Sequence, residues 1–219
     1  MVVPQNVTHA YRIMGKIERN IAGGEGSTGI YGSITATGMQ KIIDAMKAYG
    51  LSATSVFVDV GAGLARPMIH AHVDPGVMKT VGYEIDPIKC LKAHTMITRV
   101  RESGVIPPTA ETTLICSNVA SESKLPHGTT HVYAFWQGFS ENDRRGLGNL
   151  FRKCSTARCI VVVQNVRDGF AAHPELAMEW MGFGPLRFAK KMSVAASGSG
   201  GQFTAFVFVK RKRQRKLTF

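Results

Sequence analysis

Short apolar runs alternate along the chain with stretches whose apolar residues recur at helical spacing. Five of the runs are rich in β-branched or aromatic residues, and we expect each of them to form a strand. The predicted strands cover residues 55–60, 79–85, 112–118, 130–136 and 158–165. Helices are expected between them, at residues 35–49, 64–73, 86–103 and 141–153.

Residues that favour helix starts support these assignments. Thr35 or Thr37 can cap the first helix, because a hydroxyl there accepts a hydrogen bond from a free backbone N–H group. Pro67 suits a first turn, where a missing N–H group costs nothing. Asp86 followed by Pro87 predicts the start of the third helix.

The two ends of the chain have patterns of their own. Residues 4–22 have mixed apolar spacing, which predicts one or two irregular helices, and the glycine-rich connector "AGGEGSTG" follows. Residues 186–196 and 201–210 read as two strands joined by a turn that includes "SGSGG", and therefore as a hairpin.

Strands that alternate with helices predict an α/β fold. We expect a Rossmann-like class I methyltransferase architecture: a mostly parallel central sheet with a C-terminal antiparallel hairpin and an N-terminal helical segment. The expected organisation is a helical segment and connector at residues 1–30, a methyltransferase domain at 31–209 and a basic tail at 210–219.

Composition narrows the class of protein. The chain has 219 residues, of which 44% are hydrophobic, and no apolar run approaches the roughly 20 residues that span a bilayer. Its four cysteines contain no C-x-x-C pair, so we expect reduced thiols in the cytosol or nucleus and no zinc site. His70 and His72 are two residues apart, which places them on different faces of a helix.

Charge adds a class of partner. The formal net charge is +12, and "KRKRQRK" near the C-terminus holds six of the 27 basic residues. A basic body with a basic tail favours polyanions such as DNA, RNA or nucleosomes, and the tail also resembles a nuclear localisation sequence. The predicted nucleic-acid contacts are Lys210, Arg211, Lys212, Arg213, Arg215 and Lys216.

The turn "VDVGAG" after the first predicted strand is the candidate ligand site. Gly61 and Gly63 allow the backbone to approach a ligand closely. A third glycine of the dinucleotide pattern would fall at Arg66, and its absence disfavours NAD and FAD. Glu84 ends the second strand, where a carboxylate accepts hydrogen bonds from ribose hydroxyls.

These residues together predict S-adenosylmethionine as the cofactor. Asp59 can serve the ammonium group of a zwitterionic ligand, and Asn118 can pair with an adenine edge. An adenosine joined to an amino acid meets both requirements. We place Thr35, Ile85 and Val119 beside them in the cofactor site.

Two strings resemble a known family. "IYGSITATGMQKIIDAM" followed by "VFVDVGAG" is similar to the non-SET histone lysine methyltransferases of the Dot type, over roughly residues 30–165. The resemblance implies that Tyr31 lies at the cofactor and the acceptor channel. The family's Glu and Thr after Tyr-Gly are replaced here by Ser33 and Ile34.

The segment after the fourth strand departs from the family further. Where the family has Asn-Asn-Phe, this chain has "FWQGFS", in which Gln137 can supply an amide and Phe139 an aromatic ring. With Tyr31 and Trp136, these residues are the predicted catalytic set, lining an apolar channel that would lower the pKa of a lysine amine by desolvation.

The resemblance implies methyl transfer to a lysine, with histone H3 in nucleosomes as the expected substrate and the nucleus as the location. An RNA methyltransferase is the alternative, because a basic surface and a Trp-Gln pair suit a stacked base equally well. The Asp/Asn-Pro-Pro-aromatic string of exocyclic-amine enzymes is absent. A non-catalytic, methyltransferase-like protein that binds nucleic acid is the third possibility.

Overall fold

The computed structural model describes residues 2–27, 32–165, 169–197 and 201–211. Within them, eight strands form one sheet in the order β1-β7-β8-β6-β5-β2-β3-β4. The neighbouring strands β6, β5, β2, β3 and β4 pair in parallel. The strands β8, β7 and β1 continue the sheet beyond β6 with antiparallel pairings. The strands are β1 (Ser33–Ile34), β2 (Val56–Val60), β3 (Lys79–Glu84), β4 (Glu111–Cys116), β5 (Thr129–Phe135), β6 (Cys159–Gln164), β7 (Leu186–Ser197) and β8 (Gln202–Lys210).

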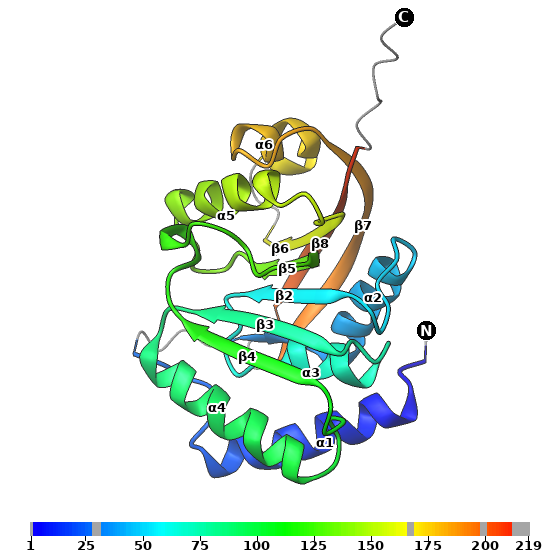
Figure 1. Ribbon diagram of the computed structural model, residues 1–219, viewed down its shortest axis with the longest axis vertical. Coiled ribbons are helices and arrows are strands. Elements are labelled where there is room, and N and C mark those ends of the chain that lie inside the picture. Colours follow the sequence, from blue (N-terminus) through cyan, green and yellow to red (C-terminus); the bar gives the residue numbers. More distant parts are fainter. Residues whose placement is uncertain (1, 28–31, 166–168, 198–200, 212–219) are drawn as a thin grey trace, which may run out of the picture.

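Helices cover both faces of the sheet (Figure 1). On one face lie α1 (Gln5–Asn20), α2 (Ala36–Lys47), α3 (Arg66–Val73) and α4 (Pro87–Glu102). On the other lie α5 (Glu141–Lys153) and α6 (Pro174–Trp180), with 3-10 turns at Val119–Ser121 and Gly169–Ala171. This arrangement confirms the predicted Rossmann-like fold.

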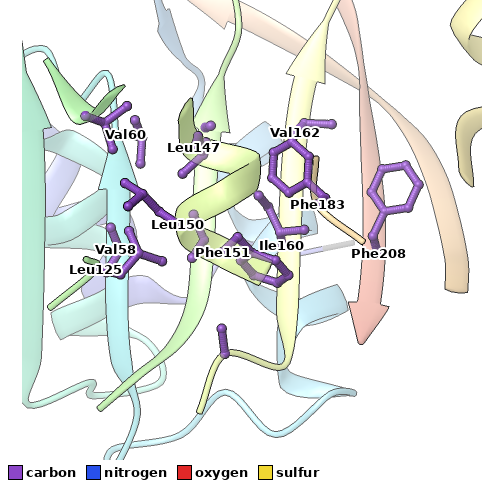
Figure 2. Close-up of a cluster of buried hydrophobic side chains, with 14 of the residues drawn as sticks. Val58, Val60, Leu125, Leu147, Leu150, Phe151, Ile160, Val162, Phe183 and Phe208 are labelled. Atoms are coloured by element: carbon purple, nitrogen blue, oxygen red, sulfur yellow. The ribbon is translucent and has the colours of Figure 1, made fainter. Parts of the chain in front are cut away.

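The central strands are buried on both faces, which explains their continuous apolar runs. Phe57 of β2 packs in the cluster that contains Ile42 of α2, while the next residue, Val58, packs in the cluster of Leu150 and Phe151 from α5. Figure 2 shows this second cluster, in which the α5 side chains lie over β2, β5 and β6. The sheet is thereby fixed between two helical layers.

The predicted caps are confirmed. Thr35 caps α2 and accepts a hydrogen bond from the Gly38 N–H group at 3.1 Å. Asp86 caps α4 and accepts from the N–H groups of Ile88 and Lys89. These caps set the register of the helices that flank the ligand-binding turn.

Three local predictions were incomplete. The N-terminal segment is one regular helix, α1, whose apolar residues Met14 and Ile17 pack against α3 and α4. The short elements β1 and α6 were not predicted, because two and seven residues are too few for a period to show. The strand β1 matters for the site, since it pairs with β7 at the edge of the cavity.

The expectation of four reduced cysteines was wrong for one pair. Cys90 of α4 and Cys116 at the end of β4 form a disulfide, and their Cα atoms are 5.9 Å apart. Their separation of 26 residues hides this proximity in the sequence, which arises because α4 packs back along β4. Cys154 and Cys159 are free.

No helix in the described part of the chain is both long and apolar enough to cross a membrane.

Candidate active site

A cavity of about 650 Å³ opens at the carboxyl ends of the parallel strands. The chain runs outward from β2 through β3 to β4 and then returns to β5 on the other side of β2. Ligands of doubly wound sheets bind at such a switch point. The lining comes from the β2–α3 turn, the ends of β3, β4 and β5, and the β1 and β7–β8 edge.

The glycine turn after β2 forms one wall. Gly61 and Gly63 have φ angles of +79° and +53°, which favour glycine. The N–H groups of Gly61 and Ala62 donate to the carbonyl oxygen of Tyr83 at 2.8 and 2.9 Å. The turn is therefore bound to the end of the neighbouring strand before any ligand arrives.

Glu84 holds this turn from the end of β3. One carboxylate oxygen accepts from the Gly63 N–H group at 2.8 Å, and the other accepts from the Asp86 N–H group at 2.9 Å. The side chain lines the cavity and is 6% exposed. Its carboxylate retains lone pairs for further donors, because each oxygen accepts only one of these two bonds.

Asp59 belongs to β2, next to Val60 of the cavity wall, but is not itself part of the lining. The residue is fully buried, and neither carboxylate oxygen has a hydrogen-bond partner within the described structure. Burial, with a further contribution from the carboxylate of Glu84, raises the pKa of Asp59 well above its usual value. Burial therefore favours the neutral, protonated form of this side chain.

The far wall comes from β4 and the start of α5. Asn118 follows β4, where its side-chain Nδ2 donates to Asp143 at 2.7 Å and its side-chain Oδ1 accepts from the Ala120 N–H group. Asn118, Val119 and Ile85, which were predicted as cofactor-binding residues, line the cavity, and so does Asp143, which no sequence motif indicated. The Asn118–Asp143 bond links residues 25 apart, a contact that sequence spacing does not reveal.

The loop after β5 brings two residues of the predicted catalytic set to the cavity. Gln137 and Phe139 line the cavity. Trp136 does not: it is 1% exposed and packs in the core between Phe170 and Phe183. The backbone N–H group of Trp136 donates to the carbonyl oxygen of Val163, so Trp136 continues the β5–β6 pairing by one residue. Because side chains alternate along a strand, the side chain of Trp136 then faces the opposite side from that of Phe135.

Other predicted residues lie elsewhere. Thr35 caps α2 and is absent from the lining, and Tyr31 lies outside the described residues. The cavity is also lined by residues that were not predicted as site residues. They come from β1, β5, β7, β8 and the residue after β6: Ile34, Tyr133, Phe135, Asn165, Ala196 and Phe203. Only the assembled sheet brings these five elements together.

The described part of the basic tail folds onto the domain. The Lys210 ammonium group donates to the carbonyl oxygens of Phe151 and Cys154 at the end of α5, at 2.7 and 2.6 Å. Arg211 pairs with Glu175 at 2.9 Å. The expectation that the whole cluster stands free of the core is therefore corrected for these two residues, and Lys212, Arg213, Arg215 and Lys216 lie outside the described residues.

No group of three or more metal-ligating side chains occurs among the residues described. His70 and His72 are both buried in α3. His70 contacts Tyr11 and Gln40, and His72 contacts the carbonyl oxygen of Val77.

Gly61→Ala is expected to destabilise the protein more than Gly63→Ala. Both substitutions place a side chain at positive φ, at a cost of roughly 1–2 kcal/mol. A Cβ at Gly61 would also lie 2.9 Å from the Phe139 ring, whereas a Cβ at Gly63 meets nothing within 4 Å. Crowding of this kind adds about 1–3 kcal/mol. Urea denaturation of the two variants measures the difference, and equal losses would show that Phe139 moves freely.

No family model and no curated protein matches this sequence. Solved structures do resemble it. A candidate RNA methyltransferase from Pyrococcus horikoshii has a TM-score of 0.62 and 11% identity, over 91% of this chain and 98% of its own. The fold is that of the class I methyltransferases.

Two further structures agree with this fold. TrmK from M. capricolum, solved with S-adenosylhomocysteine, has a TM-score of 0.56 and 11% identity over 82% of this chain and 70% of its own. A candidate tRNA methyltransferase from Streptococcus pneumoniae has a TM-score of 0.52 and 13% identity over 80% of this chain and 70% of its own. These comparisons give no support to the Dot-type histone specificity that the sequence motifs suggested.

Proposed function

We propose that this protein is an S-adenosylmethionine-dependent methyltransferase that acts on RNA. The observation that carries the cofactor assignment is the Glu84 carboxylate beside the glycine turn. Glu84 lines the cavity, and each of its oxygens keeps a lone pair beyond the bonds from Gly63 and Asp86. The ribose hydroxyls of an adenosine would donate to these oxygens.

The other lining residues fit the same ligand. Ile85 and Val119 supply apolar surface beside Glu84 for a flat base, and Asn118 and Asp143 supply polar atoms at its edge. The cavity of about 650 Å³ lies within the usual range for cofactor sites. When bound, S-adenosylmethionine supplies a methyl group already activated on a sulfonium.

The protein's task is then to orient the acceptor. Gln137 and Asn165 line the cavity where the carboxyl ends of β5 and β6 meet it, and the aromatic ring of Phe139 lies close to Gly61 of the glycine turn. Holding the acceptor in line with the methyl group lowers the barrier chiefly through alignment. The aromatic rings of Phe135 and Phe203 limit the access of water.

RNA is favoured as the substrate class for two reasons. The chain carries a net charge of +12, which suits a polyanion. The structural neighbours include a candidate RNA methyltransferase and a candidate tRNA methyltransferase. Methylation of a histone lysine remains the competing hypothesis. Trp136, which was predicted to line the lysine channel, lies instead in the core. The nuclear location stays a prediction from the basic tail.

The deciding experiment offers radiolabelled S-adenosylmethionine with total RNA, nucleosomes or free histones. We expect label in RNA. Glu84→Gln is the matched variant, because it preserves the shape of the side chain and removes the charge that would accept from ribose. One lost charged hydrogen bond costs about 1.5–3 kcal/mol, so S-adenosylmethionine should bind at least about tenfold more weakly. Label in histones alone would restore the lysine hypothesis, and cofactor binding without transfer to any substrate would favour a non-catalytic role.

A further inference from the structure

A second cavity, of about 530 Å³, adjoins the candidate active site. It lies between the start of α5 and α6, which pack side by side (Figure 1). Phe139 lines both cavities, so the two cavities lie next to each other at this residue. We call the second cavity the α5–α6 groove. Its lining is Phe139, Glu141, Arg144, Arg145, Phe170, His173, Leu176, Ala177, Trp180 and Met181.

The groove combines an exposed aromatic ring with positive charge. Trp180 at the end of α6 is 73% exposed, and Leu176 one turn earlier is 53% exposed. Large apolar side chains are rarely left this exposed without a function when they gather in a hollow. The chain's other tryptophan, Trp136, is 1% exposed, so Trp180 is the tryptophan that solvent or a ligand can reach.

Two arginines line the same groove. Arg145 donates to the Trp180 carbonyl oxygen at 3.3 Å and pairs with Glu141 at 2.7 Å, in an ion pair that is itself exposed to solvent. Such an exposed pair is weak and yields readily to a stronger anion. Arg144 lies with its guanidinium 5.0 Å from the Trp136 ring centroid, and its Nε atom is buried without a partner in the described chain.

We infer that the α5–α6 groove binds an unpaired nucleotide of the RNA substrate, with its base stacked on Trp180 and its phosphate paired with Arg145. Arg144 adds positive charge to the floor of the groove. Stacking platforms beside cations are how proteins hold single strands, because every base has an aromatic face and every link carries a phosphate.

This inference rests on the proposed function and adds a path for the RNA strand across the protein surface. A nucleotide held in the α5–α6 groove places the next nucleotide of the strand at Phe139, which opens on the candidate active site. The protein would therefore require single-stranded RNA around the modified position. A paired duplex cannot offer its bases to Trp180 without unstacking them.

The test measures binding of a labelled single-stranded oligouridylate by fluorescence anisotropy. Trp180→Ala should weaken binding at least about fivefold, and Trp180→Phe should retain part of the affinity. Arg145→Gln should reduce the salt slope of binding by about 0.7, as expected for one phosphate contact on a single strand. Leu91→Ala is the matched control, because Leu91 of α4 is also 73% exposed and does not line the groove.

Further outcomes separate this inference from the proposed function. RNA methylation with an unchanged KM in Trp180→Ala would overturn the groove and leave the function standing. Trp180-dependent binding of oligouridylate without methylation of any RNA would support the groove and remove the function. Equal binding of a matched duplex, or binding of a histone H3 tail peptide in place of RNA, would overturn the single-strand assignment.

Discussion

Glu84→Ala is expected to destabilise the free protein and to abolish tight binding of S-adenosylmethionine. The carboxylate accepts two backbone hydrogen bonds, from Gly63 at 2.8 Å and from Asp86 at 2.9 Å. Each such bond to a charged acceptor contributes about 1.5–3 kcal/mol, so roughly 3–6 kcal/mol of stability depends on this one side chain. The cofactor then loses its ribose partner and also the shape of the turn that approaches it.

Thermal denaturation and calorimetric titration with S-adenosylmethionine test both effects. Glu111→Ala is a matched control, because Glu111 is also the terminal residue of a strand, at the start of β4, but its side chain is 66% exposed and pairs with Lys79. Exposed pairs contribute at most about 1 kcal/mol. If Glu84→Ala bound the cofactor as tightly as Glu111→Ala does, the assignment of this cavity would be wrong.

Glu84 shows how much of the candidate site can be predicted from the sequence. Its place at a strand end, downstream of the glycine turn, follows from local patterns of apolar residues and helix caps. These patterns act over a few residues, and they predicted β2, β3, α4 and the Asp86 cap correctly. The two hydrogen bonds that fix the turn depend on how β2 and β3 are paired, and local patterns do not contain that information.

Trp136 and Lys210 show where local patterns mislead. Trp136 follows the apolar run of β5, and whether it faces the cavity or the core depends on one more ladder bond, to Val163. Lys210 belongs to a run of cations, yet its ammonium group donates to the carbonyl oxygens of Phe151 and Cys154 at the end of α5. Cations at a helix C-terminus are favourable, so tertiary contact overrides the prediction of a free tail.

A marked loss of stability in mild acid is the second large effect that we expect. His70 in α3 is buried, with Nδ1 3.2 Å from the Tyr11 hydroxyl and Nε2 3.0 Å from the Gln40 carbonyl oxygen. Burial lowers the pKa of His70 to about 4, and the nearby charges of Asp74 and Lys47 act in opposite directions. His131 in β5 is buried beside Tyr49, and burial lowers its pKa to about 4 as well.

The direction follows from proton uptake. An unfolded histidine has a pKa of about 6.5, so between pH 6.5 and pH 4 the unfolded chain binds more protons than the folded one. Stability from each histidine is complete above pH 6.5 and is lost as the pH falls toward 4. At pH 5 the loss is about 2 kcal/mol per histidine. Asp59 works against it, since a carboxyl with a raised pKa favours the folded state as the pH falls.

Comparison with a variant isolates the histidine from Asp59. The free energy of unfolding is measured by urea at pH 7 and pH 5 for the wild type and for His131→Gln, in which the amide can still reach the Tyr49 carbonyl oxygen. The wild type should lose about 2 kcal/mol more than the variant between the two pH values, because only the wild type gains a proton at this position on unfolding. If wild type and His131→Gln lose stability in parallel, His131 is already protonated or hydrated in the folded state, and the dry packing of β5 against Tyr49 is wrong.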